Sequence, residues 1–248
     1  MLPEPFNLEG RKAVMASRGG KLTRALASAL LEAGASLALV LPSSKSGDEV
    51  VESLKGQGAD VMVVPWDPGD VPGLRKTVEE AVSRLGQVDI LVNDLSTEFA
   101  RPFKDMTGQE WQQVIQLNLD SVFYACKGVA PHMLARRGGR IVNVASALGA
   151  RVVVNESAYC TAMGGVLQLT RALGLEWARD NIRVNAIAPG WITDSPDELP
   201  DNIRRYIPMQ RWGRPEDLGG LLVYLASESC SYTTGETIFV DGGVMIRT

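Results

Sequence analysis

The spacing of one serine, one tyrosine and one methionine in this sequence points most directly to a chemical function. Ser146 lies thirteen residues before Tyr159, and Met163 follows Tyr159 by four residues. A serine hydroxyl can polarise a substrate oxygen, and a tyrosine hydroxyl can exchange a proton with it. The pKa of a phenol is ordinarily about 10, and a neighbouring cation lowers it. Met163 has no charge and no hydrogen-bond donor, so it cannot activate Tyr159 in this way.

Short apolar runs alternate with longer amphipathic segments along the chain, and this pattern predicts the elements that hold these side chains. The predicted strands are rich in Val, Ile and Leu, as expected for strands covered on both faces: 12–16, 36–40, 60–64, 89–93, 140–145, 183–187 and 237–240. The predicted helices are 22–33, 48–57, 71–85, 108–136, 157–179 and 215–226. Repeated strand–helix–strand units require a parallel sheet. The sequence therefore predicts one doubly wound α/β domain of the Rossmann type over residues 1–248, with its ligand crevice at the carboxyl ends of the strands.

The composition narrows the class of protein. Hydrophobic residues make up 45% of the 248, which excludes disorder, and the net charge of −4 argues against binding to nucleic acid. Residues 1–8 lack the apolar region of a signal peptide, and the longest stretch without charge, 157–170, is too short to cross a membrane. Three widely spaced cysteines, Cys126, Cys160 and Cys230, favour buried reduced thiols over a metal site. We therefore expect a cytoplasmic protein that holds no metal.

From Leu8 to Gly243 the chain resembles the short-chain dehydrogenase/reductase (SDR) family, and within it the 3-oxoacyl-reductase type. The motifs that carry the resemblance are Gly-Arg-Ile-Val-Asn-Val-Ala-Ser at 139–146, Tyr159, Ile-Arg-Val-Asn-Ala-Ile-Ala-Pro-Gly at 182–190, Arg-Trp-Gly-Arg-Pro-Glu-Asp-Leu at 211–218 and Thr-Gly-Glu-Thr-Ile-Phe-Val-Asp-Gly-Gly at 234–243. The resemblance implies a seven-stranded parallel sheet with three helices on each face. It also implies a site for NAD or NADP.

The resemblance assigns three of the family's four catalytic positions. Asn118, Ser146 and Tyr159 match the asparagine, serine and tyrosine, whereas Met163 stands where the family has lysine. In the family the tyrosine exchanges a proton with the substrate oxygen, the serine polarises that oxygen, and the asparagine holds a water. Without the lysine we expect Tyr159 to be a poor base at neutral pH. It is less handicapped as the acid of a carbonyl reduction.

The loop after the first strand departs from the family's glycine-rich pattern. Ser17, Lys21 and Thr23 fill the three glycine positions, although Gly19 and Gly20 remain. Glycines at such positions let the backbone approach a diphosphate, so the Cβ of Thr23 is expected to obstruct it. The alternative is that Lys21, with Arg18, binds phosphate directly.

Further cofactor positions follow from the same resemblance. The turn at Ser43 lacks the acid typical of NAD enzymes and would suit NADP better, whereas Asp67 either contacts adenine or forms a turn before Pro68. Asp94, after Asn93, would repel a diphosphate unless it is paired. The complete predicted set for the cofactor is Ser17, Gly19, Lys21, Leu22, Ser43, Asp67, Asn93, Pro189 and Thr193.

Two further regions have counterparts in the family. Residues 191–210 correspond to the substrate lid, which is short here. The helices predicted at 108–136 and 157–179 correspond to the helices through which SDR subunits pair. We therefore expect a homo- or hetero-oligomer built on these two helices.

Three hypotheses about function remain open. Altered residues at three separate places converge on the nicotinamide cofactor, so the leading hypothesis is a protein without a cofactor that has lost NAD(P)-dependent catalysis. It would act as a structural or regulatory subunit beside a catalytically competent SDR paralogue. The alternative is an NADP(H)-dependent oxidoreductase acting on a 3-oxoacyl or 3-hydroxyacyl thioester, or a related ketone or alcohol. The third is a small-molecule binder or a cofactor-independent enzyme that reuses Ser146 and Tyr159.

Overall fold

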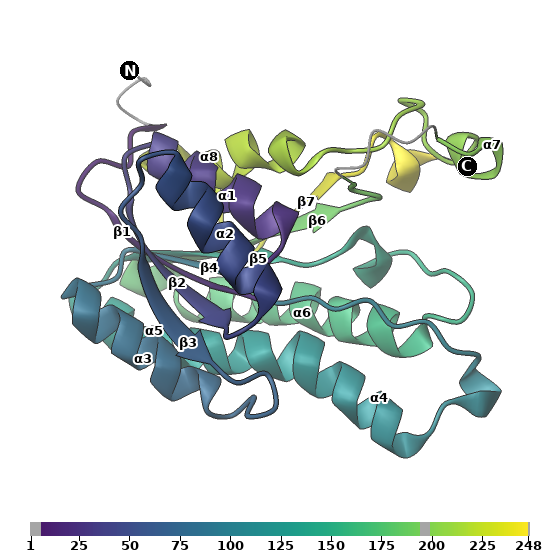
Figure 1. Cartoon of the computed structure of the whole chain (residues 1–248), viewed down its shortest axis with the longest axis horizontal. Helices are drawn as coiled ribbons and strands as arrows, with labels where there is room; N and C mark the ends of the chain where they lie inside the picture. The colour runs from purple at the N-terminus through teal and green to yellow at the C-terminus, as the bar shows by residue number, and fades with distance from the viewer. Residues whose placement is uncertain (1–5, 194–198, 248) are drawn as a thin grey trace.

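Seven apolar stretches form the parallel sheet expected from the sequence (Figure 1). The computed structural model describes residues 6–193 and 199–247. Within this part of the chain the strands are β1 (Lys12–Ser17), β2 (Ser36–Pro42), β3 (Met62–Trp66), β4 (Ile90–Asp94), β5 (Gly139–Val144), β6 (Ile182–Pro189) and β7 (Thr237–Val240). Each differs from its predicted span by at most two residues at either end.

The order of the strands creates a crevice between β1 and β4. The order is β3-β2-β1-β4-β5-β6-β7, so the chain winds in one direction from β1 to β3 and in the other from β4 to β7. Loops that leave such a switch point diverge, and ligands of doubly wound folds bind there. The register places Ser17, the last residue of β1, opposite Asp94, the last residue of β4. Both residues therefore face the mouth of this crevice.

Helices cover the sheet on both faces (Figure 1). On one face, α1 (Lys21–Glu32), α2 (Lys45–Gly56) and α8 (Gly219–Ala226) bury an apolar cluster that includes Leu26, Val50 and Leu222. On the other face, α3 (Leu74–Leu85), α5 (Ser121–Arg136) and α6 (Ser157–Glu176) bury a second cluster that includes Val78, Val129 and Val166. Because both faces are covered, the strands are almost continuously apolar.

The long helix predicted at 108–136 is interrupted in the structure. It consists of α4 (Gly108–Ile115), a π-helical segment at Gln116–Asp120, and α5. Thr107 caps α4 as its residue type suggests, because its Oγ1 accepts a hydrogen bond from the backbone N–H of Glu110 at 3.2 Å. A π-bulge within an α-helix is rare and is found mostly at functional sites.

The segment after β6 is irregular. Ile192 forms a parallel bridge with Gly213, and a short helix, α7 (Asp201–Arg204), follows. The sequence pattern did not predict this helix. Of the lid expected at 191–210, residues 194–198 lie outside the described part of the chain.

Candidate active site

Three hydroxyl groups meet at the start of α6. Tyr159, in the first turn of this helix, is 4% exposed, and its hydroxyl forms hydrogen bonds with the side chains of Ser146 and Ser96. Ser146 follows β5, and its Oγ also accepts a hydrogen bond from the backbone N–H of Leu148 at 3.2 Å. The structure therefore brings the predicted pair together. It adds Ser96, which had no assigned role.

The surroundings of Tyr159 keep its phenol protonated. Burial raises the pKa of Tyr159 to about 12; the carboxylates of Glu98 and Glu156 add to this rise, and the hydrogen bonds from Ser146 and Ser96 offset part of it. A group with that pKa is ionised in roughly one molecule in 10⁵ at neutral pH. At neutral pH Tyr159 is therefore a hydrogen-bond donor rather than a base.

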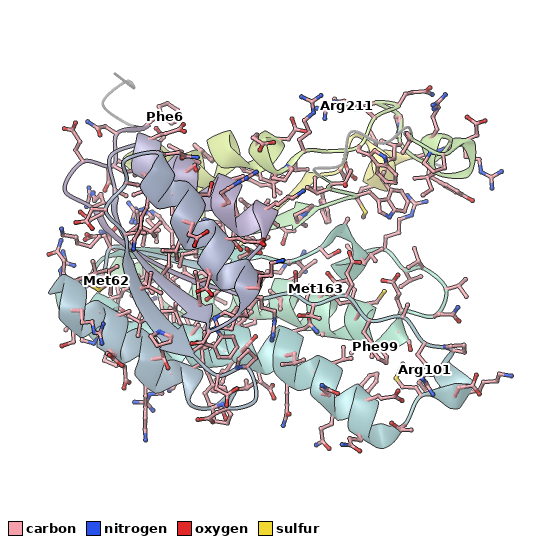
Figure 2. All side chains as sticks on the ribbon, in the orientation of Figure 1. Phe6, Met62, Phe99, Arg101, Met163 and Arg211 are labelled. Atoms are coloured by element: carbon pink, nitrogen blue, oxygen red, sulfur yellow. The ribbon has the colours of Figure 1, made fainter. Side chains whose placement is uncertain are left out.

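Met163, a residue of α6, is part of the apolar core. Its side chain is 1% exposed and belongs to the cluster that α3, α5 and α6 bury against the sheet (Figure 2). The backbone approaches Gly149 so closely that a Cβ at that glycine would lie 2.9 Å from the carbonyl oxygen of Met163. The position that the resemblance gives to a lysine thus holds a buried apolar side chain.

Asn118 lies within the π-helical segment and ties it to the loop after β4. Its Oδ1 accepts a hydrogen bond from the backbone N–H of Thr97 at 2.7 Å, and its Nδ2 donates to the carbonyl oxygen of Val114 at 2.9 Å. The side chain is 1% exposed. Asn118 therefore fixes the loop that carries Ser96 and Glu98 beside Tyr159.

The side chains at two of the family's glycine positions gather around a carboxylate. The hydroxyls of Ser17 and Thr23 donate to Oδ2 of Asp94 at 3.1 and 2.8 Å, and their own oxygen atoms lie 2.5 Å apart. Ser17 and Thr23 are fully buried, and Asp94 is 8% exposed. Burial raises the pKa of Asp94, and the bonds from Thr23 and Ser17 oppose part of that rise.

This cluster bears on two expectations. Asp94 was expected to repel a diphosphate unless paired, and it is paired. Thr23, whose Cβ was expected to obstruct a diphosphate, directs its hydroxyl to Asp94 within the protein. The substitutions in β1, α1 and β4 therefore form one hydrogen-bonded unit.

Arg18 crosses the crevice between β1 and β4. Its Nε donates to the carbonyl oxygen of Leu95 at 2.8 Å and its Nη2 donates to that of Leu117 at 3.2 Å. Its guanidinium carbon lies 5.6 Å from the centre of the Trp66 ring, within the range of a cation–π contact. Burial lowers the pKa of Arg18. Arg18 therefore contacts protein carbonyls and an aromatic ring at the place where the alternative reading of the loop would have it bind phosphate.

Asn93, Asp67 and Ser43 lie at the ends of β4, β3 and β2. Asn93 is fully buried, and its Nδ2 donates to Oδ1 of Asn143 at 2.8 Å. Asp67 is exposed, and its Oδ1 accepts a hydrogen bond from the backbone N–H of Gly69 at 2.8 Å, as in the turn that was the alternative reading. Ser43 is exposed in the turn before α2. The side chain of Asn93 thus bonds within the core, and that of Asp67 within its own turn.

The remaining predicted cofactor residues lie at the same edge of the sheet. Gly19 has a φ of +85°, and its backbone is so close to Ser46 that a Cβ would lie 3.0 Å from it. Lys21 and Leu22 begin α1, Pro189 ends β6, and the backbone N–H of Thr193 donates to the carbonyl oxygen of Gly213 at 2.9 Å. The β1–α1 loop therefore packs directly against the start of α2.

A cavity of about 610 Å³ opens beside the three hydroxyls. Its lining combines apolar side chains with charged and polar ones: Glu98, Ser146, Ala147, Leu148, Arg151, Val152, Val153, Val154, Glu156, Pro189, Gly190, Trp191, Ile203, Arg205, Tyr206 and Val244. Sequence reasoning missed its four charged residues, Glu98, Arg151, Glu156 and Arg205. Glu156 lies three residues before Tyr159, and Glu98 lies five residues after Asn93; that proximity was the available signal.

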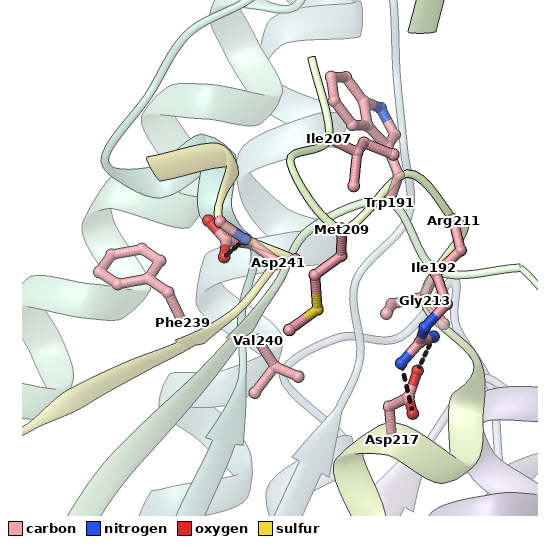
Figure 3. A pocket seen from close by; sticks show the side chains of 12 residues that line it. Trp191, Ile192, Ile207, Met209, Arg211, Gly213, Asp217, Phe239, Val240 and Asp241 are labelled. Carbon is pink, nitrogen blue, oxygen red and sulfur yellow. Dashed lines mark hydrogen bonds and ion pairs between the residues drawn. The ribbon is translucent and has the colours of Figure 1, made fainter. Parts of the chain in front are cut away.

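Trp191 lines both this cavity and a second one of about 430 Å³, which Figure 3 shows. The second cavity lies between β7 and the irregular segment, and its walls include Ile207, Met209 and Val240. At its edge Arg211 and Asp217 form an ion pair, with Nη1–Oδ2 and Nη2–Oδ1 distances of 2.6 and 3.2 Å. The hydrogen bond from Arg211, followed by that from the backbone N–H of Arg214, lowers the pKa of Asp217.

Two features are absent from the described residues. In residues 6–193 and 199–247, histidine, cysteine and acidic side chains form no group of three that could hold a metal ion. Over the same residues, no helix has the length and apolar character needed to span a membrane.

The fold and the site define the class of protein. Residues 19–245 match the family described as "Enoyl-(Acyl carrier protein) reductase", and the sheet order and the Asn118–Ser146–Tyr159 arrangement agree with the resemblance found in the sequence. The chain belongs to the short-chain dehydrogenase/reductase family.

Individual relatives match this chain over nearly its whole length. It is 34% identical over 244 residues to a 3-oxoacyl-[acyl-carrier-protein] reductase of Chlamydia pneumoniae, covering 96% of this chain and 98% of the relative. It is 33% identical to a 2-dehydro-3-deoxy-D-gluconate 5-dehydrogenase of Escherichia coli, covering 100% of both. Its structure is similar to that of a gluconate 5-dehydrogenase from Burkholderia cenocepacia in complex with NADP and tartrate, with a TM-score of 0.90, 28% identity and 99% of each chain covered.

Proposed function

We propose that this SDR-family chain does not carry out nicotinamide-dependent catalysis on its own and serves as a structural or regulatory subunit beside a competent SDR paralogue. The observation that carries the proposal is that Met163, four residues after Tyr159, is a buried apolar side chain. Without a cation near the phenol, the pKa of Tyr159 rises to about 12 instead of falling. Each pKa unit corresponds to about 1.4 kcal/mol, or a factor of ten. The loss of activation is therefore large for a reaction that needs the phenolate.

The β1–α1 loop supports the same proposal, because its residues fit a dinucleotide poorly. Dinucleotides need a glycine-rich turn whose backbone can approach the pyrophosphate. In this chain Arg18 crosses the crevice to Leu95 and Leu117, and Ser17 and Thr23 bond to Asp94. These contacts are made by the protein with itself at the edge of the sheet where the family binds its cofactor.

The subunit half of the proposal rests on the surfaces of α4, α5 and α6. Four glutamines of α4 and the adjoining π-helical segment line a surface depression: Gln109, Gln112, Gln113 and Gln116. Phe123 of α5 is 44% exposed and Leu175 of α6 is 82% exposed. Exposed apolar side chains beside a patch of amides suit a contact between proteins.

A second function, NADP(H)-dependent reduction of a 3-oxoacyl thioester or a related ketone, is favoured by the relatives. Two relatives that match nearly the whole chain are a reductase and a dehydrogenase, and a similar solved structure contains NADP. Asn118, Ser146 and Tyr159 are in place, and a protonated Tyr159 is the form that donates a proton to a carbonyl oxygen. For this function the Arg18 contacts would have to open to admit the nucleotide.

One titration separates the two functions. Purified protein is titrated with NADPH and with NADH up to millimolar concentrations, following nucleotide fluorescence and calorimetric heat. The proposal predicts no saturable binding, whereas saturation in the micromolar range would support the reductase. Purification of the chain from its native source tests the partner. A second SDR chain in the complex supports the subunit role, and a homo-oligomer alone contradicts it.

A further inference from the structure

The 610 Å³ cavity gathers proton donors, carboxylates and arginines on one open surface. Glu98, Ser146, Arg151, Glu156 and Arg205 all line it. Glu98 comes from the loop after β4, Ser146 from the end of β5, and Glu156 from the residue that precedes α6. Three segments far apart in the sequence thus bring their polar side chains to the same cavity.

The hydroxyl groups of this cavity can hold a carbonyl oxygen. Ser146 lines the cavity, and Tyr159 lies directly behind it, joined to it by a hydrogen bond. The buried phenol keeps its proton over the whole neutral range. A hydroxyl donor such as Ser146, itself held by the buried Tyr159, stabilises the negative charge that develops on an oxygen when an adjacent C–H bond breaks. This task does not require a tyrosinate or a lysine.

The carboxylates supply the complementary group. Glu98 and Glu156 are close enough to interact with one another and with Tyr159. Glu98 is exposed at the mouth of the cavity, where it can meet a substrate, and Glu156 is half-buried. Burial, followed by the charge of Glu98, raises the pKa of Glu156. A carboxylate beside a pair of hydroxyl donors is an arrangement suited to removing a proton from the carbon next to a carbonyl.

We propose that this cavity catalyses cofactor-free proton transfer at the carbon adjacent to the ketone of a keto acid. Glu98 takes the proton, Ser146 holds the ketone oxygen, and Tyr159 positions the Ser146 hydroxyl from behind. The C–H bond breaks, its electron pair forms the carbon–carbon double bond of an enolate, and the carbonyl π electrons move to the oxygen. Return of the proton from Glu98 to carbon regenerates the ketone. The cycle consumes no oxidant or reductant, and it is independent of nucleotide binding.

The arginines define the class of ligand. Arg151 lines the cavity and donates a hydrogen bond to the carbonyl oxygen of Val244. Arg205 also lines the cavity, and its guanidinium carbon lies 5.2 Å from the centre of the Tyr206 ring. Two guanidinium groups on the wall attract a carboxylate. The exposed Val152 and Val154 offer apolar contact between the charged groups. The cavity therefore suits a small keto acid whose carboxylate lies toward the arginines and whose ketone lies toward Ser146.

The test is hydrogen exchange without any nucleotide. The protein is incubated with 4-oxopentanoate in D₂O, and loss of the proton signals next to the ketone is followed by NMR. We expect protein-dependent exchange above the buffer rate. Glu98→Gln should slow it by about 100- to 10,000-fold, as expected for loss of a general base. Ser146→Ala should slow it by about 100- to 1,000-fold, as expected for loss of a donor to the oxyanion, and Tyr159→Phe should slow it less, because Tyr159 acts through Ser146.

Glu98→Gln is the decisive variant because Glu98 is exposed, so the fold should tolerate the change. Glu52→Gln, at an exposed position of α2, is the matched control and should leave exchange unchanged. Exchange no faster than in buffer would overturn the proposal, and so would equal exchange by the wild type and Glu98→Gln. Because no nucleotide is present, these results are independent of the NADPH titration.

Discussion

Thr23, in the first turn of α1, donates a hydrogen bond from Oγ1 to Oδ2 of Asp94 at the end of β4, over a distance of 2.8 Å. These residues are 71 positions apart in the sequence. Ser17 completes the contact from β1. Residues that a comparison with the family pattern treats as three separate losses are therefore partners, and a change at one of them removes a hydrogen bond from a buried polar group.

The Ser17–Thr23–Asp94 cluster should make stability depend on pH. The folded state raises the pKa of Asp94, so folding favours the neutral acid. This contribution is fully present below the unfolded pKa of about 3.9 and is lost as the pH rises through the higher folded pKa. Asn at this position is neutral at every pH. The stability of Asp94→Asn relative to the wild type should therefore increase as the pH rises above about 4.

Urea unfolding of both proteins across this range measures the difference, and other titrating groups cancel between them. A difference that stays constant with pH would contradict a raised pKa for Asp94. Thr23→Val, which removes the hydroxyl and keeps the shape, should cost about 1–3 kcal/mol at neutral pH because it leaves Asp94 short of a partner.

We expect that Met163→Lys will not restore reductase activity. The new ammonium group would lie where a side chain that is 1% exposed now packs in the core. An uncompensated buried charge costs about 3–5 kcal/mol of stability. We expect a less stable protein without reductase activity and without micromolar NADPH binding. Met163→Leu, which roughly conserves volume, should cost less than about 1.5 kcal/mol. Carbonyl reduction by the lysine variant would show that Met163 alone disables the site.

Sequence patterns predicted the sheet and much of the site because they depend on local or regular features. Apolar runs identified the strands, and family motifs identified Asn118, Ser146 and Tyr159. The partnership of Ser17, Thr23 and Asp94 was beyond the sequence because it depends on the register between β1 and β4. The path of Arg18 to Leu117 was missed for a similar reason, since it spans 99 positions. The π-helical segment was also missed, because the sequence there is compatible with a continuous α-helix.

The pKa of Tyr159 can be measured directly, and it reports on the surroundings of the phenol. Its pKa is about 12 in the folded protein, above the unfolded value of about 10. Its contribution to stability is therefore present below about pH 10 and is lost as the pH rises toward 12. The difference in absorbance between wild type and Tyr159→Phe should show no phenolate from this residue up to about pH 10. A phenolate that appears near neutral pH would mean that a cation reaches Tyr159 in solution and would favour the reductase.

Arg18→Ala tests whether the arginine closes the crevice against a nucleotide. The change removes the donors to the carbonyl oxygens of Leu95 and Leu117 and the contact with Trp66. Hydrogen bonds from a charged donor contribute about 1.5–3 kcal/mol each, so a measurable loss of stability is expected. If Arg18 is the main obstruction, the variant should bind NADPH more tightly than the wild type does. Lys76→Ala, at an exposed position of α3, removes a cation without touching the crevice and should match the wild type. If neither the wild type nor Arg18→Ala binds NADPH, the obstruction lies in the Ser17–Thr23–Asp94 cluster. A variant that combines Arg18→Ala and Thr23→Gly would then test the cluster.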